Sequence, residues 1–217
     1  LKRLWIGTGS AGLFYYDIIR KSLSDIPIRN FPKQPILAIR KDAKNTLLIG
    51  IDGQGIWNIS EKGDTILHIY KEDLNNPFSL RGDGVYDILC DGSKNWIATF
   101  TGKLSFFENN NSQITPVTYQ INNPNSLGNN YVNQIIEDHE GHIWFATNNG
   151  VSRWDAASNK WKHYYQNKSE QAKVFLSLCE DNQGHIWAGS YSSGIYLLDR
   201  ETGKTLKHYS SKTNTPG

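Results

Sequence analysis

The sequence has no methionine, only two cysteines and almost no net charge: its 217 residues carry 23 Lys and Arg against 21 Asp and Glu. The basic residues are scattered, which excludes the basic patch of a nucleic-acid-binding domain. No apolar run approaches the roughly 20 residues that span a bilayer, and no signal peptide opens the chain. The missing initiator Met indicates a processed or trimmed piece, which leaves an exported or membrane-anchored parent open.

What the sequence does have is a fivefold repeat of a short aromatic strand, a polar turn and a second strand. The units read LWIGTGSAGLFYYD, LLIGIDGQGIWNIS, NWIATFTGKLSFF, IWFATNNGVSRWD and IWAGSYSSGIYLLD. Their markers are Trp5, Leu48, Trp96, Trp144 and Trp187, at steps of 43, 48, 48 and 43 residues. This spacing is typical of four-stranded propeller blades. The alternation in IWFAT (143–147) excludes helical repeats of similar length.

The rest of each unit supplies three more strands. Strand A is an apolar run that ends on an acid (132–138, 174–181), B carries the marker, C follows a turn (194–199), and D is a shorter run (66–70, 161–165, 205–209). Asn- and Pro-rich loops, such as 75–84 and 122–130, join D to the next A. The sequence therefore predicts an all-β fold, with about five four-stranded antiparallel blades over residues 1–217. Because the first unit lacks a strand A, we expect a segment of a longer, seven-bladed propeller.

The residue two positions after each marker is always small. These residues are Gly7, Gly50, Ala98, Ala146 and Gly189. They lie on the marker's face of the strand, where a small residue makes room for the indole or for a side chain of the next blade.

The two cysteines, Cys90 and Cys179, fall near the ends of the A strands of the third and fifth units. Two blade steps exceed the roughly 7 Å between Cα atoms that a disulfide allows. We expect two buried free thiols, which say nothing about the redox compartment.

The titratable residues predict no metal site, no cofactor and no enzyme. His68, His163 and His208 are placed in one D-strand slot, and His142 and His185 at one turn position; equivalent slots on different blades are too far apart to share an ion. We expect Asp138 and Asp181 to accept hydrogen bonds from their own turns. No carboxylate pair at glycosidase spacing, nucleophile elbow or phosphate loop is found.

A ligand would be expected at the end of the blades that bears the D–A and B–C loops. Candidates there are Arg81, Asp83, Asn129, Asn130, Tyr131, Phe100, Asn148, Asn149 and Tyr191. The predicted binding residues are Arg81, Asp83, Asn130, Tyr131, Phe100, Asn148 and Tyr191. Aromatic faces beside Asn, Asp and Arg suit a sugar, but the same residue types also form plain polar loops.

The Asn-Pro-x-Ser-Leu loop, the A strand closing on Glu-Asp, the Gly turn and the W-[IF]-[AG]-T strand together resemble the two-component regulator propeller repeat. The fullest match is NNPNSLGNNYVNQIIEDHEGHIWFATNNGVSRWD, residues 122–155. The fifth unit matches from its A strand onward, and the first in LWIGTGSAGLFYYD. The second and third units are looser, since Leu48 replaces the marker Trp and the turn 91–96 is one residue short.

The resemblance implies a sensor rather than an enzyme. Repeats of this kind build the periplasmic region of hybrid two-component sensor histidine kinases in Bacteroides-like gut bacteria. In such parents, the implied partners are a second propeller, an immunoglobulin-like domain, a dimer mate and an oligosaccharide. The implied response is transcription regulation of polysaccharide-utilisation genes, with the membrane reached only through the parent.

Two alternatives stay open beside the sensor. One is a structural or protein-interaction propeller without its own small-molecule site, for which a broad apolar patch would speak. The other is a propeller lyase, which needs His and Glu from neighbouring blades at the channel.

Overall fold

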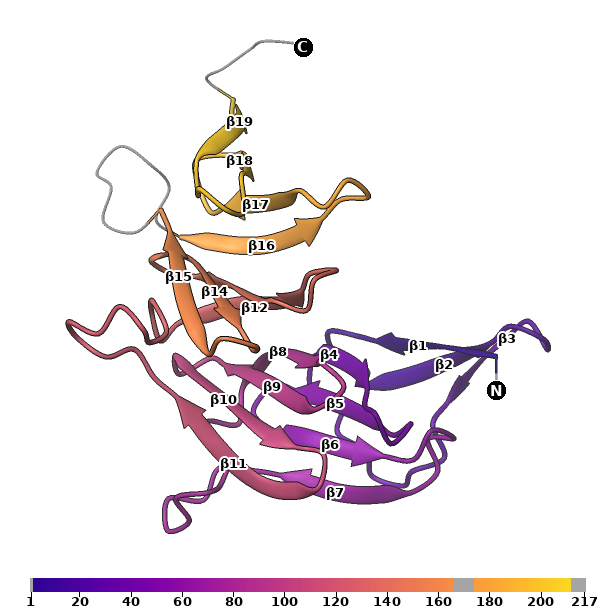
Figure 1. Ribbon diagram of the computed structural model, residues 1–217. Helices are drawn as coiled ribbons and strands as arrows, with labels where there is room; N and C mark the ends of the chain where they lie inside the picture. The colour runs from indigo at the N-terminus through magenta and orange to yellow at the C-terminus, as the bar shows by residue number, and fades with distance from the viewer. Residues whose placement is uncertain (1, 166–173, 212–217) are drawn as a thin grey trace. The chain divides into compact units, whose positions relative to one another are not determined.

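The chain forms strands and turns, with no helix among the residues that the structure describes. The computed structural model describes residues 2–165 and 174–211 (Figure 1). It divides into two compact units, Leu1–Pro116 and Val117–Gly217, each described here by itself. Across the described ranges, no helix is long and apolar enough to cross a membrane. The prediction of one segment over residues 1–217 stays a prediction.

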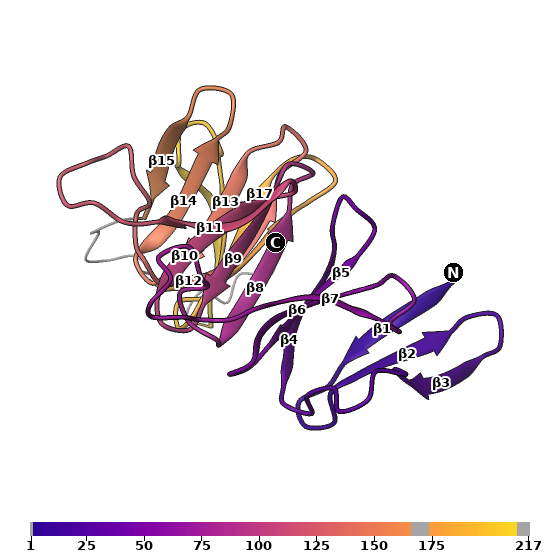
Figure 2. The ribbon, with the colours of Figure 1, turned by 90° about the horizontal axis from the view of Figure 1, so that it is seen from below.

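Unit 1 holds three antiparallel sheets, named blades 1 to 3. Blade 1 contains β1 (Arg3–Gly7), β2 (Leu13–Asp17) and β3 (Ser22–Asp25). Blade 2 contains β4 (Ile36–Lys41), β5 (Leu47–Ile51), β6 (Gly55–Ile59) and β7 (Ile66–Tyr70). Blade 3 contains β8 (Val85–Cys90), β9 (Lys94–Thr99), β10 (Lys103–Glu108) and β11 (Asn111–Val117). Strands β4 and β8, the first strands of successive blades, lie side by side (Figures 1 and 2).

Unit 2 holds two four-stranded antiparallel sheets, blades 4 and 5. Blade 4 contains β12 (Val132–Glu137), β13 (Ile143–Thr147), β14 (Gly150–Asp155) and β15 (Lys160–Tyr164). Blade 5 contains β16 (Phe175–Glu180), β17 (Ile186–Ser190), β18 (Ile195–Leu198) and β19 (Thr205–Tyr209). The predicted all-β architecture of four-stranded antiparallel blades is confirmed, with the first sheet three-stranded.

The marker tryptophan is tied to the acid that ends strand A. Asp138 Oδ1 accepts hydrogen bonds from the backbone N–H groups of Glu140 and His142, and its Oδ2 accepts 2.8 Å from Trp144 Nε1 and 3.0 Å from His142 Nδ1. Asp181 does the same for Trp187 at 2.9 Å. The expected bonds from Asp138 and Asp181 to their own turns are therefore confirmed. The indole bond, which the sequence analysis did not anticipate, joins this turn to the core.

The turn acids Asp138, which is buried, and Asp181, which is partly exposed, should make the fold acid-sensitive. Burial raises the pKa of Asp138, but the hydrogen bonds from Trp144 and His142 outweigh it, so the pKa lies below its usual value. The Trp187 indole lowers the pKa of Asp181. A depressed folded-state pKa gives stability that is complete above the unfolded value of about 3.9 and is lost below it.

We therefore expect the urea midpoint to stay level from about pH 7 to about pH 5 and to fall below about pH 4. Asp181→Asn should flatten that decline, because the amide does not titrate. A midpoint that rose on acidification would contradict this account.

Successive blades pack through the small residue that follows the marker. A Cβ added to Gly7 would lie 2.6 Å from Ile36 Cγ2, and one added to Gly50 would lie 2.9 Å from Val85 Cγ1. Ile36 and Val85 each open the next blade. Of the two uses predicted for the small residue, the next blade's side chain is the one seen at these glycines.

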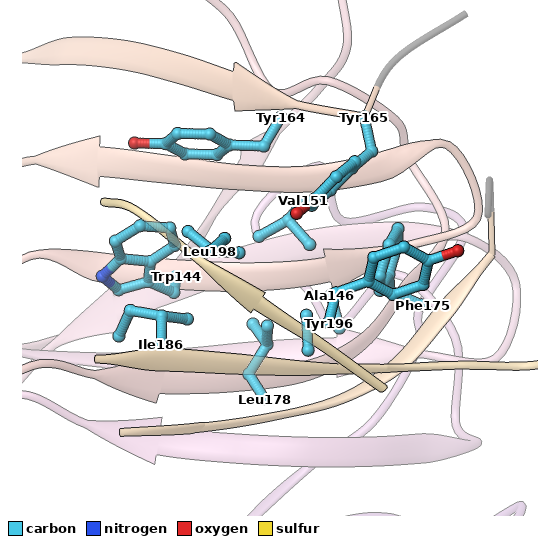
Figure 3. Packing of buried hydrophobic residues seen from close by; sticks show 11 residues of the cluster. Trp144, Ala146, Val151, Tyr164, Tyr165, Phe175, Leu178, Ile186, Tyr196 and Leu198 are labelled. Atoms are coloured by element: carbon cyan, nitrogen blue, oxygen red, sulfur yellow. The ribbon is translucent and has the colours of Figure 1, made fainter. Parts of the chain in front are cut away.

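In unit 2 the space between blades 4 and 5 is filled by aromatic residues. Trp144 is fully buried and stacks on Tyr164, with ring centroids 5.2 Å apart. Tyr165, Phe175 and Tyr196 form a second aromatic group with centroids 5.2 to 5.7 Å apart (Figure 3). This cluster joins the two sheets into one core.

The Asn-Pro-x-Ser-Leu loops are closed at the neck by their serine. Ser79 Oγ donates to Asp73 O and accepts from Asp73 N–H, and Ser126 Oγ accepts from Gln120 N–H at 3.0 Å. The leucine that follows, Leu80 or Leu127, is fully buried. The motif therefore encodes a loop anchored in the core.

Two expectations about single residues were wrong. Both thiols are free, but Cys90 is half-buried and Cys179 is exposed. Cys90 pairs with the residue before the marker and Cys179 with the marker itself, so the two side chains lie on opposite faces of their strands. The D-strand histidines do not share one slot: His163 pairs with Ser152 and His208 with the equivalent Tyr196. His68 lies one residue earlier and therefore points to the other face.

Candidate functional site

In every four-stranded blade, the first strand carries one extra residue opposite the second strand. The pairing shifts between Ile36 and Ala38, Val85 and Asp87, Val132 and Gln134, and Phe175 and Ser177. The extra residues are Leu37, Tyr86, Asn133 and Leu176. A bulge of this kind re-aims its side chain out of the regular alternation, and bulges are frequent beside binding sites.

Each extra residue lies beside the residue that directly follows strand B. These turn residues are Asp52, Phe100, Asn148 and Tyr191. In all four blades the N–H of the turn residue donates to the carbonyl just before strand A, over 2.7 to 3.1 Å; the acceptors are Pro35, Gly84, Tyr131 and Val174. We call the four sets bulge–turn pairs: Leu37–Asp52, Tyr86–Phe100, Asn133–Asn148 and Leu176–Tyr191.

In unit 1 the pair of blade 3 is an exposed aromatic stack. The rings of Tyr86 and Phe100 lie 4.1 Å apart at 13°, although their side chains are 37% and 53% exposed. A Cβ on Gly84 would lie 3.1 Å from Phe100 Cβ and 3.5 Å from Asp52 Oδ1, so a carboxylate borders the stack. The site thus joins an apolar ring surface to a strong hydrogen-bond acceptor.

In unit 2 the two pairs combine amides with an exposed tyrosine. Asn133 Nδ2 donates 2.9 Å to Asn148 Oδ1 and 2.7 Å to Phe175 O, which links blade 4 to blade 5. Tyr191 is 75% exposed, and Leu176, the bulge residue of the same pair, is 45% exposed. These groups can bind a neutral polar ligand through an aromatic face and amide hydrogen bonds. Among the described residues, no group of three or more His, Cys, Asp or Glu could hold a metal ion.

The predicted binding residues fall into two sets. Phe100, Asn148 and Tyr191 belong to bulge–turn pairs, and Tyr131 is half exposed and accepts the Asn148 N–H. The other three take part in loop hydrogen bonds.

In that second set, Arg81 Nη2 donates to Pro77 O, Asp83 Oδ1 accepts 2.7 Å from Glu72 N, and Asn130 Oδ1 accepts 2.7 Å from Tyr119 N. Asp83 and Asn130 thus support equivalent loops in units 1 and 2.

Tyr86, Asn133 and Leu176 were not predicted as site residues, because regular alternation along strand A does not place them beside the B–C turn. The available signal was the spacing of apolar residues. Val85 and Ile88, like Val132 and Ile135, are buried three positions apart rather than two. That spacing within a strand indicates an extra residue.

The repeated blades and their bulge–turn pairs define a protein of the β-propeller repeat class. Residues 126–149 and 169–192 match the family described as two-component regulator propeller. These two segments match the family model, and the resemblance seen in the sequence is confirmed. No curated protein matches the sequence.

Solved structures show the same fold at low identity. The extracellular domain of the putative hybrid two component system BT3049 from B. thetaiotaomicron is similar with a TM-score of 0.70 and 21% identity, over 82% of this chain and 25% of that one. PorZ of the Porphyromonas gingivalis type-IX secretion system gives 0.69 and 15%, over 99% and 33%. The computationally designed Ika8 protein gives 0.69 and 11%, over 96% and 59%. The chain therefore spans a quarter to a third of these two natural structures.

Proposed function

We propose that this chain is an extracytoplasmic ligand-sensing module of a hybrid two-component sensor, and that its ligand is an oligosaccharide. The observation that carries the proposal is the exposed stack of Tyr86 and Phe100 with Asp52 at its border. Sugar C–H faces pack on such rings, and sugar hydroxyls need acceptors and amides beside them. The family match and the fold shared with a sensor's extracellular domain support the sensing role.

Signalling requires that the ligand bind two states of the sensor with different affinity. In this proposal, the blades form a rigid surface, and the bound sugar changes how that surface packs against another domain or a dimer mate in the periplasm. The histidine kinase of the parent protein then reads this change. Scattering of the parent's whole sensor region with and without ligand tests this step, and an unchanged envelope and dimer state would contradict it.

The sugar site is tested by isothermal titration calorimetry, in which the parent's sensor region is titrated with a panel of plant and host oligosaccharides. The variants Phe100→Ala and Tyr191→Ala are titrated in parallel. Removing an aromatic platform should weaken binding about tenfold. Leu206→Ala is the matched control, since Leu206 is a half-exposed apolar residue on the last strand of blade 5. Equal affinity for all variants would exclude the rings of Phe100 and Tyr191 as the sugar platform.

A protein-interaction role is favoured by one observation. Two of the four bulge positions carry exposed leucines, Leu37 at 41% and Leu176 at 45%. Apolar groups at these positions suit a protein partner rather than a sugar. Failure of every oligosaccharide to bind the parent's sensor region would favour this alternative.

A further inference from the structure

Unit 1 contains a pocket of about 250 Å³ between blades 2 and 3. Its lining includes Asp42, Asn58, Tyr70, Asn95 and Glu108. Asp42 follows strand β4 and Glu108 ends strand β10, so the pocket lies at the end of the blades that bears the A–B and C–D turns. In an antiparallel sheet this is the opposite end from the bulge–turn pairs. The site is thus separate from the one proposed above.

The equivalent space in unit 2 is filled by two large side chains. Leu48 pairs with Asn58 in blade 2 as Trp144 pairs with Arg153 in blade 4. The Arg153 guanidinium lies 5.6 Å from the centre of the Trp144 ring.

The same guanidinium donates to the C–D turn of the next blade, at 3.4 Å to Arg200 O and 3.2 Å to Glu201 Oε1. The corresponding turn of blade 3 lines the pocket in unit 1. In unit 1 the smaller residues Leu48 and Asn58 stand in place of Trp144 and Arg153, and the space that they do not fill is the pocket.

The lining of this pocket includes a buried amide, Asn95. Asn95 is only 1% exposed, whereas the equivalent positions hold the buried residues Leu47, Ile143 and Ile186. Asn95 Nδ2 donates 2.9 Å to Asn109 Oδ1, and Asn109 Nδ2 donates 2.8 Å to Gly92 O. The Gly92 carbonyl can only accept, which fixes the orientation of both amides.

Asn95 Oδ1 is therefore a buried acceptor, and it has no partner among the described residues. A buried polar atom in this condition is costly unless a ligand or water pairs with it.

Three further groups of the pocket, Asn58 Oδ1 and the carboxylates of Asp42 and Glu108, are acceptors. Asn58 Oδ1 is buried and has no partner within the described chain. Among the residues that the structure describes, Asp42 Oδ2 accepts from the Thr46 hydroxyl alone, whereas the equivalent Asp138 Oδ2 accepts from both an indole and an imidazole. Burial, followed by the Asp42 charge, raises the pKa of Tyr70 to about 12. Exposed Glu108 adds a second carboxylate, and the one cationic lining residue, Lys44, is exposed.

We propose that this pocket binds a guanidinium group from outside the chain. Such a group has the shape and the N–H donors of the Arg153 side chain that fills the equivalent place in unit 2. A guanidinium group is planar and carries five N–H donors, so it can pair with the two unpartnered amide oxygens and with the two carboxylates. The ligand class is a small guanidinium compound or an arginine side chain.

The test is a titration of the full 217-residue chain, followed by NMR on the side-chain amide of Asn95. Methylguanidinium should give saturable shifts, and the uncharged N-methylurea should give much smaller ones. L-arginine and N-acetyl-arginine amide then distinguish a free amino acid from a peptide-borne group. Equal shifts with N-methylurea, or no saturable shift, would overturn the proposal and leave water as the occupant.

Two variants sharpen the result. Asn58→Arg should supply the guanidinium in cis, weaken methylguanidinium binding at least tenfold and raise the melting temperature. Asn95→Leu removes the orphan acceptor, restores the residue type of the other blades and should also weaken binding. Leu206→Ala, in the other unit, should leave methylguanidinium binding unchanged. If a folded Asn95→Leu protein kept its affinity for methylguanidinium, the proposed site would be contradicted. This outcome does not depend on the result of the oligosaccharide experiment.

Discussion

Replacing Asp138 by Ala should lower the free energy of unfolding by about 3 kcal/mol, because the change leaves the fully buried indole N–H of Trp144 without an acceptor. The Asp138 carboxylate accepts four hydrogen bonds, two from turn backbone N–H groups and one each from the His142 and Trp144 rings. It is only 3% exposed, so water cannot replace it. Urea denaturation followed by tryptophan fluorescence measures the loss.

The comparison that makes this result specific is the same substitution in blade 5. Asp181 holds Trp187 through the same bonds, but its side chain is 30% exposed. Asp181→Ala should therefore cost less than Asp138→Ala, since water reaches the abandoned donors. Asp138→Asn keeps one acceptor oxygen and should lie between wild type and Asp138→Ala. Equal losses for the two alanine variants would show that the turn, rather than the indole bond, dominates.

The blade repeat could be predicted from sequence because its strands obey a simple period. The strands predicted at 66–70, 143–147 and 205–209 coincide with β7, β13 and β19. Each run contains a marker tryptophan or ends on a tyrosine, and turn residues lie on both sides of it. Local pattern was sufficient because the blades are meanders whose neighbouring strands are also neighbours in sequence.

The candidate site could be predicted only in part because it depends on irregularities in that pattern. The loop residues Phe100, Asn148 and Tyr191 were found from topology alone. Their partners Tyr86 and Asn133 were missed, because a bulge reverses the face expected from alternation. His68 was assigned to the wrong face for a related reason. It lies one register position from the slot of His163 and His208, and one position separates the two faces of a strand.

Departures from the repeat carry information that the repeat itself does not. Leu48 and Asn95 each break the pattern of the other blades; Asn95 lines the pocket in unit 1, and Leu48 pairs with Asn58, which lines it too. A core position that changes from apolar to amide loses stability unless something pairs with it. Comparison of repeats within one chain therefore identifies a candidate site without any homologue.

The small residue after the marker gives the second large prediction. Gly50→Val should lower the free energy of unfolding by about 3 kcal/mol and Gly50→Ala by about 1 kcal/mol, because the site is already filled by the next blade. The added Cβ would lie 2.9 Å from Val85 Cγ1 and 3.2 Å from Ala38 Cβ, so blade 3 must move away from blade 2 or the strand must bend.

Gly9→Ala is the matched control for Gly50→Ala, since a Cβ there meets nothing within 4 Å and no left-handed backbone is required. It should change stability by less than about 0.5 kcal/mol. Val85→Ala combined with Gly50→Ala should recover part of the loss, because shortening the facing side chain returns the space that the new methyl group takes. A double variant no more stable than the sum of its two single changes would show that contact with Val85 does not explain why this position is glycine.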